Sequence, residues 1–439
     1  MTNIALIVLD TLRKDAFDRY FDWLPGRRYE RTYTTANWTV PAHASLFTGR
    51  YGSEVGVHAE HLYCDCPEPT LAEQLSEAGY TTRAFSANTN ITSYFEFDRG
   101  FADFWTPELF DGQDYDNVFN WREFNRMTGA TGVRKYLWGV YDCITSNVKT
   151  LPSLLDGARL KLSDGLGVKY GGTHEAITEL RDVEFGDQEF LFCNLMETHE
   201  PYRVPEEYRT LDEPSLTNSV GDITFDTVDA ERTRKAYDDC ARYLSNVYRE
   251  LFDSLIEEFE YVITISDHGE MLGEYGAWAH EHGVYPELTH VPLVVSGNDL
   301  SGQHTHPASL LDVHQTVLDL ASVDGDSRGR NLLDDVDNGR REYLTEYLGL
   351  TPWNKRKLKA NGFGDQIEQY DTALFGYVAP TDYYGYETTD GFEEMGVTKI
   401  DAPRDHLGEL VAARNVRRVE QANDVPDEVK DQLEHLGYA

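Results

Sequence analysis

The segment Asn3–Asp10, which reads NIALIVLD, decides the expected fold. It is a nearly continuous aliphatic run that ends in a carboxylate, and such a run is typical of a strand buried on both faces of a parallel sheet. Comparable apolar runs recur along the chain. They predict further strands at Thr81–Ser86, Glu189–Leu195, Tyr261–Ser266 and Val291–Ser296.

Amphipathic segments separate several of these strands. Apolar residues at helical spacing predict helices over Leu71–Ala78, approximately Asp229–Glu257, and Ser309–Ala321. Strands that alternate with helices form parallel sheets, because each crossover carries the chain back to the same edge. The sequence therefore predicts an α/β fold with a mostly parallel central sheet flanked by helices on both faces.

Two parts of the chain break this alternation. Residues 107–172 are rich in aromatic, Asp and Asn residues, and we expect them to form an inserted cap or substrate-side region. From residue 341 the chain becomes rich in Tyr and Gly, which predicts a small C-terminal α+β subdomain over 341–439. Its antiparallel strands should precede a final helix at Pro426–Leu436. Residues 1–340 then form the catalytic domain.

Composition restricts the partners and the location of the protein. The 439 residues include 77 acidic and 39 basic side chains, for a formal net charge of −38. This charge disfavours nucleic acid and anionic membranes as partners, and it resembles that of proteins from salt-loving archaea. No stretch approaches 18 apolar residues and the N-terminus lacks the features of a signal peptide, so we expect a cytoplasmic protein with no membrane span. Nothing in the composition indicates an oligomeric state.

The five cysteines do not suggest a structural metal site. Cys64 and Cys66 lie close together, but no second close pair completes a zinc knuckle. A chain of this length can also bury a sufficient core without disulfides.

Groups suited to metal binding occur where predicted strands end. Asp10 follows the first strand, and Asp267-His268 follows another in the segment ISDHGE. Parallel sheets present ligand-binding groups at their carboxyl edge, so these side chains are candidates for a divalent-metal site. Each aspartate alone could equally be a turn former or a helix cap.

The segment Trp38–Arg50, WTVPAHASLFTGR, is predicted as a short helix. Thr39 can cap its start, Pro41 suits the first turn, and Gly49 suits the end. This pattern describes any well-capped helix. It also places a hydroxyl among free N–H groups at a helix N-terminus, where a tetrahedral oxyanion could be held beside a nucleophile.

The same segment resembles the signature C/S-x-P-x-R-x-x-L-x-T-G-R of the sulfatase family in the alkaline phosphatase superfamily. Further segments resemble other elements of that family in the family's order. They are LIVLDTLRKD, RGFADF, METHEPY, SDHGEMLGEYG and HVPLVVSG, followed by SLLDVHQTVLDL. The residues of the signature that fall in register are Pro41, Leu46, Thr48, Gly49 and Arg50.

The resemblance implies a one-metal site formed by Asp10, Thr39, Asp267 and His268. Threonine cannot become formylglycine by the sulfatase route, and a Thr nucleophile is what lipoteichoic-acid synthases and phosphoethanolamine transferases use. The second Asp of the family's usual pair is Thr11 here. An imidazole ligand favours Mn²⁺ or Zn²⁺ over Ca²⁺, which remains a third option.

The resemblance also assigns candidate catalytic roles to four histidines. His199 would stabilise the transferred oxyanion or protonate the leaving group. His280 and His282 lie where the family places a leaving-group Lys or His, and the sequence does not choose between them. His43 replaces the signature arginine and could hold an oxygen of the substrate. Supporting positions around the site are expected at Arg13, Asp15, Arg50 and Glu270.

The combined interpretation is a metal-dependent hydrolase or transferase acting on sulfate or phosphate esters of small molecules or glycans. Thr39 would form a covalent intermediate, and phosphodiester or phosphonate substrates are slightly favoured, because metal-activated hydroxyls usually act on phosphate esters. Three alternatives remain open. They are a sulfuric ester hydrolase without formylglycine, a vestigial anion- or glycan-binding protein, and a two-metal phosphatase or phosphomutase that would need more ligands.

Overall fold

The architecture comes from a computed structural model that describes residues 2–107, 171–212, 214, 218–297, 299–334 and 342–419, with isolated positions between 140 and 153. Two compact units are present, residues 1–107 with 171–422 and residues 108–170 with 423–439. The first unit contains every element described below. The predicted insertion at 107–172, apart from a few positions, and the predicted helix at Pro426–Leu436 lie outside the described residues. So does the predicted domain boundary at residue 340.

A central eight-stranded sheet confirms the predicted α/β class. Five neighbouring strands in the order β9-β1-β6-β4-β5 are parallel to one another, and β1 lies between β9 and β6. The strands, in their order across the sheet, are β14 (Gln303–His304), β2 (Arg27–Tyr29), β13 (Leu293–Gly297), β9 (Tyr261–Ile265), β1 (Ile4–Leu9), β6 (Glu189–Leu195), β4 (Thr81–Ser86) and β5 (Asp103–Trp105).

The aliphatic run at the start of the chain is the centre of the core. All six residues of β1 have no solvent exposure, as expected for a strand covered on both faces. The predicted strand Val291–Ser296 is divided at Pro292, because proline cannot donate to the ladder, into β12 (His290–Val291) and β13. β13 runs antiparallel to β9, so the sheet is mostly and not wholly parallel.

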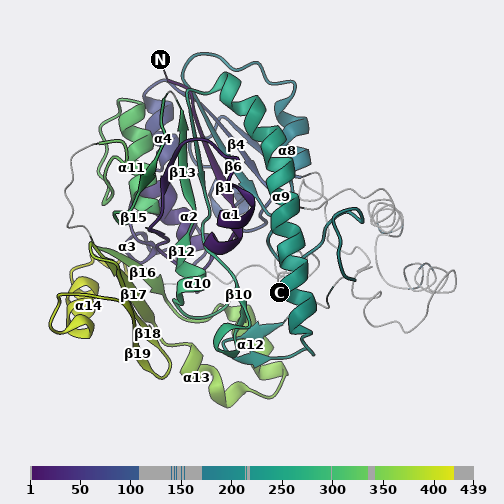
Figure 1. The fold of residues 1–439 in the computed structure, drawn as a ribbon, viewed down its shortest axis with the longest axis vertical. Helices are drawn as coiled ribbons and strands as arrows, with labels where there is room; N and C mark the ends of the chain where they lie inside the picture. Colours follow the sequence, from purple (N-terminus) through teal and green to yellow (C-terminus); the bar gives the residue numbers. More distant parts are fainter. Residues whose placement is uncertain are drawn as a thin grey trace. The chain divides into compact units, whose positions relative to one another are not determined.

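Helices cover both faces of this sheet, as Figure 1 shows for α4 and α11 on one side and α8 and α9 on the other. One layer consists of α2 (Thr39–Thr48), α4 (Leu71–Glu77) and α11 (Leu310–Leu320), which pack on one another. In the other layer α1 (Lys14–Tyr20) and α8 (Thr173–Leu180) pack on the long helix α9 (Ala230–Glu258). Every residue of α2 is buried.

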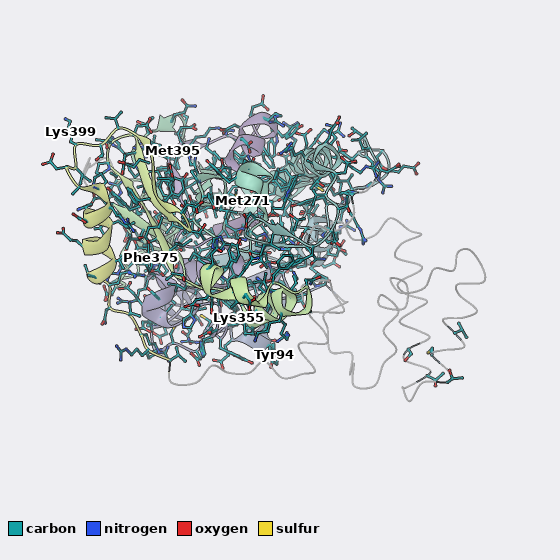
Figure 2. The ribbon with its side chains drawn as sticks, turned by 90° about the horizontal axis from the view of Figure 1, so that it is seen from below. Tyr94, Met271, Lys355, Phe375, Met395 and Lys399 are labelled. Carbon is teal, nitrogen blue, oxygen red and sulfur yellow. The ribbon has the colours of Figure 1, made fainter. Side chains whose placement is uncertain are left out.

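The C-terminal part forms a four-stranded antiparallel sheet, which confirms the predicted small α+β region. Its strands are β16 (Tyr343–Tyr347), β17 (Leu374–Ala379), β18 (Tyr383–Thr388) and β19 (Gly391–Gly396). Within residues 342–419 these strands are accompanied by the α-helices α12 (Pro352–Ala360), α13 (Ile367–Tyr370) and α14 (Pro403–Ala412). On the outer strand β19, Met395 is 49% exposed (Figure 2).

Hydrogen bonds join this sheet to the α/β core. The Thr345 hydroxyl donates to the Thr34 carbonyl at 2.6 Å, and the Glu346 amide donates to the Thr35 carbonyl at 2.8 Å. The segment at residues 34–35 leads directly into α2. The C-terminal sheet therefore fixes the chain that enters the helix of the candidate nucleophile.

Short elements complete the described part of the chain. They are β3 (Thr32–Tyr33), α3 (Gly52–Val55), η1 (Ser93–Phe95), β7 (Ser219–Val220), β8 (Ile223–Thr224), β10 (Met271–Leu272), η2 (Glu274–Gly276), β11 (Trp278–Ala279), α10 (Pro286–Thr289), β15 (Ala308–Ser309) and η3 (Gly364–Gln366). In the described residues every helix is too short or too polar to cross a bilayer.

Candidate active site

The carboxyl edge of the central sheet brings the candidate metal ligands together. Asp10 follows β1, and Asp267 and His268 follow β9, the parallel neighbour of β1. One ligand atom from each residue lies within 4.8 Å of the other two, and all three side chains are buried. Among the described residues, this is the single group of at least three acidic, His or Cys side chains with such spacing. Among the described residues, no second group with such spacing is present that could hold another metal ion.

The unsatisfied atoms of this cluster point to a cation. Asp10 Oδ1 and Asp267 Oδ2 are buried and have no hydrogen-bond partner among the described residues. His268 donates from Nδ1 to the Gly269 carbonyl at 2.8 Å, so Nε2 presents its lone pair. That nitrogen lies 3.9 Å from Asp10 Oδ1 and 3.4 Å from Asp267 Oδ2. Two carboxylate oxygens and an imidazole nitrogen form a donor set that fits a divalent transition metal.

The remaining oxygens of the two carboxylates are held by the protein. Asp10 Oδ2 accepts from Asn88 Nδ2 at 2.9 Å and from Asn194 Nδ2 at 3.2 Å. Asp267 Oδ1 accepts from the backbone N–H groups of His268 at 2.9 Å and Thr11 at 3.3 Å. Burial and the nearby Asp10 raise the pKa of Asp267. Two buried carboxylates this close require a cation or a shared proton.

Thr39 lies at the same place, on the first turn of α2. Its Oγ1 is 3.2 Å from His268 Nε2. Trp38, in an extended conformation, occupies the N-cap position, so the expectation that Thr39 itself caps the helix is wrong. Thr39 is the first helical residue instead, and its hydroxyl is not used by a backbone cap. The predicted end of the helix at Gly49 is confirmed, with a left-handed φ of 66°.

His43 has both ring nitrogens engaged by the protein. Nδ1 donates to the Thr39 carbonyl at 2.9 Å, and Nε2 accepts from Asn194 Nδ2 at 3.0 Å. Burial lowers the pKa of His43 to about 4, although the Asp10 carboxylate opposes the shift. With both nitrogens engaged, the ring of His43 links helix α2 to Asp10 through Asn194. That His43 holds an oxygen of the substrate stays a prediction.

His280 and His199 lie beside the cluster, with ring centroids 5.1 Å apart. The centroid of His280 is also 4.6 Å from that of His268, and its Nδ1 is 3.1 Å from Glu270 Oε1. Burial lowers the pKa of His280, but Glu270 together with Glu281 and Glu200 outweighs burial and raises the pKa to about 10. His199 donates from Nδ1 to the Glu200 carbonyl at 2.7 Å, and burial and His280 lower its pKa. The site thus pairs a charged imidazole with a neutral one.

His282 lies elsewhere. Its ring packs against Tyr347 and Tyr370, with centroid distances of 4.8 and 5.1 Å, and burial lowers its pKa to about 4. Of the two histidines that the sequence left open, the structure places His280 beside the candidate metal ligands and His282 among tyrosines of the C-terminal part.

The expected supporting residues separate into two groups. Arg13 donates to the Glu270 carbonyl at 2.9 Å and pairs with Asp15, so both stabilise the segment after His268. Arg50 lies at the other end of α2, where it pairs with Asp326 at 2.5 Å. Among the described residues, no hydrogen bond or ion pair joins Arg50 to the candidate metal ligands.

Asn88 and Asn194 were missed by the sequence reasoning, although they hold Asp10. Asn88 lies two residues beyond β4, and Asn194 is the penultimate residue of β6. Both therefore lie at the carboxyl edge, the same signal that identified Asp10. An amide there gives no chemical indication of its role until its partners are known.

Comparisons with known proteins identify the family of the chain. Residues 4–323 match the protein family described as Sulfatase. The chain belongs to the sulfatase family. The choline-sulfatase of Rhizobium meliloti is 25% identical over 360 residues, which cover 73% of this chain and 68% of that protein. The uncharacterized sulfatase YidJ of Escherichia coli is 22% identical, over 68% of this chain and 61% of its own length.

Solved structures show the same fold. This sulfatase-family chain superposes on the phosphonate monoester hydrolase SpPMH of Silicibacter pomeroyi with a TM-score of 0.63 and 17% identity, covering 94% of each chain. A putative sulfatase of Bacteroides thetaiotaomicron gives a TM-score of 0.56 at 15% identity, covering 99% of this chain and 90% of that one. Family and fold together support a sulfatase-like ester hydrolase.

Proposed function

We propose that this protein is a metal-dependent hydrolase or transferase that cleaves sulfate or phosphate esters through a covalent intermediate on Thr39, with phosphodiesters and phosphonates as the favoured substrates. The observation that carries the proposal is the position of Thr39 Oγ1, 3.2 Å from His268 Nε2, beside two buried carboxylate oxygens without partners. A hydroxyl within a candidate metal cluster is the arrangement that activates a weak nucleophile.

Asp10, Asp267 and His268 would hold the metal ion, with Thr39 as a fourth donor. When bound, a divalent cation lowers the pKa of the hydroxyl and polarises an oxygen of the ester. Mn²⁺ and Zn²⁺ suit the imidazole ligand better than Ca²⁺ does. Asn88 and Asn194 would orient Asp10 for the metal ion, because both amides donate to Oδ2 and Oδ1 keeps no hydrogen-bond partner among the described residues.

The residues of the chain then divide the reaction into two steps. In the first step Thr39 Oγ1 loses its proton to solvent and forms a bond to phosphorus or sulfur as the bond to the ester oxygen breaks, and imidazolium His280 protonates the departing oxygen. In the second step the covalent bond on Thr39 is cleaved by water or an acceptor alcohol. Neutral His199 takes the proton of that nucleophile, Thr39 Oγ1 leaves and regains a proton, and His280 recovers its own proton from solvent.

Two arguments favour different classes of ester as the substrate. An unmodified threonine favours phosphoryl chemistry, since metal-activated hydroxyls commonly act on phosphate esters. The likeness to choline-sulfatase and the family match favour sulfate esters instead. Both classes share the same site residues, so the substrate class has to be measured.

The test uses the full chain with Mn²⁺ or Zn²⁺, at low and at molar salt, and four substrates: an aryl sulfate, an aryl phosphodiester, an aryl phosphonate and choline sulfate. Thr39→Ala should abolish turnover. Thr48→Ala is the matched control, because Thr48 ends the same helix and its hydroxyl only donates to the Ala44 carbonyl at 2.7 Å. Mass spectrometry of the quenched enzyme should detect an adduct on Thr39 that Thr39→Ala lacks.

Retained turnover in Thr39→Ala would overturn the assignment of the nucleophile. Turnover of sulfates alone, lost in that variant, would reverse the preference for phosphoryl substrates. A protein that neither binds metal nor turns over any of the four would be a binding module of the same fold.

A further inference from the structure

Helix α12 carries an unusual charge for this chain. Its segment KRKLK at residues 355–359 contains four cations in five positions, whereas acidic residues outnumber basic ones by 77 to 39 in the chain as a whole. Lys355 is neutralised by two carboxylates, Glu60 and Asp371, each at 2.8 Å. It thus secures the helix to the rest of the fold. The other three cations have no ion pair within the described part of the chain.

Two contacts place the first turn of α12 against the candidate active site. The ring of Trp353 meets the ring of Trp38 edge to face, with centroids 6.1 Å apart, and Trp38 directly precedes Thr39. Asn354 Nδ2 donates to Glu281 Oε2, and Glu281 directly follows His280. Figure 1 shows α12 beyond the carboxyl edge of the central sheet, and Figure 2 shows the same helix from below with Lys355 labelled.

A third observation concerns Lys357, which lies one turn after Trp353 and therefore on the same side of α12. The charge of Lys357 acts on Glu200, the residue that follows His199. Burial raises the pKa of Glu200 to about 8, and among its neighbours Lys357 and His280 oppose that rise. Lys357 is half-buried, whereas Arg356 and Lys359 are exposed. The helix thus directs one cation toward the site and two toward solvent.

We propose that α12 forms a subsite for the part of the substrate beyond the cleaved ester, and that Lys357 recognises a second anionic group there, a carboxylate, sulfate or phosphate. Trp38 and Trp353 would contact the ring or chain that separates the two groups. This inference rests on the proposed function, because it assumes that Thr39 marks the reacting end of the substrate.

Nearby carboxylates could instead favour a substrate with a cationic group. Glu200 lies near Lys357, and Glu281 contacts Asn354 on the same helix; a substrate with a cationic substituent would use these carboxylates instead. Two features favour the anionic group. The carboxylate of Glu281 is engaged by Asn354, and the raised pKa of Glu200 favours its neutral form near neutral pH.

The test compares three 4-nitrophenyl phenylphosphonates that share one leaving group and carry a carboxylate, a methyl or a trimethylammonium group on the phenyl ring. If only sulfates are cleaved, aryl sulfates that carry the same three groups on the ring replace them. Because that ring is then the leaving group, each rate is compared with the rate of the same compound in Lys357→Met. We expect kcat/KM to be about tenfold higher for the carboxylate than for the methyl compound, the scale of one hydrogen bond to a charged group. This preference should vanish in Lys357→Met, return in Lys357→Arg, and persist in Lys359→Met, the matched cation on the exposed side.

Equal rates for all three compounds, or a preference for trimethylammonium, would overturn the proposal. So would a carboxylate preference that Lys357→Met leaves intact. Turnover of the methyl compound that is lost in Thr39→Ala establishes the proposed function separately, so failure of the α12 subsite and failure of the nucleophile give different results.

Discussion

Asn194 provides the sharpest test of how the candidate metal centre is built. It is fully buried, and its amide donates one N–H to Asp10 Oδ2 at 3.2 Å and another to His43 Nε2 at 3.0 Å. Asn194→Leu keeps the approximate volume and removes both bonds. A buried acceptor left without a donor costs about 1–3 kcal/mol, and loss of a hydrogen bond to a charged group costs about 1.5–3 kcal/mol. Since Asp10 Oδ2 keeps Asn88, we expect the metal-free protein to lose about 2–4 kcal/mol.

The same variant should also bind metal more weakly, because Asp10 would no longer be fixed with Oδ1 in the cluster. Outer partners of metal ligands are typically worth about 10–100-fold in affinity. Urea unfolding in EDTA measures the stability, and calorimetric titration with Mn²⁺ measures the affinity. Asn246→Leu, at an exposed position of α9, is the control and should change stability by about 0.5 kcal/mol or less. A loss below about 1 kcal/mol with unchanged Mn²⁺ affinity would refute this reasoning.

Three further predictions concern stability. His314 is buried, and burial lowers its pKa to about 3. Below about pH 6.5, the ordinary pKa of a histidine, the unfolded chain therefore binds a proton that the folded chain does not. The free energy of unfolding falls as the pH falls. Between pH 7 and 5 the wild type should lose about 2 kcal/mol relative to His314→Leu in urea unfolding, and a pH-independent difference would contradict this. Mn²⁺ at about 100 times its Kd should add about 2.7 kcal/mol to the unfolding free energy, and Asp267→Asn should abolish the gain in a thermal melt. Gly49→Ala should lower the free energy of unfolding by about 2 kcal/mol or more in the same melt. The φ of Gly49 is 66°, and the added Cβ would lie 2.6 Å from His314 Nδ1 and Ser327 Oγ. An unchanged melting temperature would show that the helix end can move.

The parts of the fold that follow local rules could be predicted from the sequence. The aliphatic run at Ile4–Leu9 is β1, and the predicted strands at Thr81–Ser86 and Glu189–Leu195 match β4 and β6 residue for residue. Continuous apolar runs of this length have few alternatives in a chain with helical segments between them. The cluster of Asp10, Asp267 and His268 followed from the same rules, since parallel neighbours end at one edge.

Features that depend on long-range pairing could not be predicted. The reversed direction of β13 is set by its pairing with β9 and β2, and its own residues carry no sign of direction. The choice between His280 and His282 depends on a turn that directs the first ring to the candidate metal ligands and the second to the tyrosines. Asn88 and Asn194 resemble ordinary strand-end amides until Asp10 is placed between them. In each case the information lies in a partner tens to hundreds of residues away.

The position of β1 has a consequence for the synthesis of the protein. Ile4 pairs with Phe190 on one side and Tyr261 on the other, so β1 precedes both of its neighbours in the chain by more than 180 residues. At about 5–20 residues per second, a ribosome takes roughly 13 to 50 seconds to supply its second neighbour. During that interval an unpaired aliphatic strand is available to any other exposed edge. Production of this protein in a foreign host should therefore depend on chaperones that act on nascent chains. Slow translation should lower the yield of folded protein, and the loss should be larger than for a protein whose first strand pairs with a nearby segment.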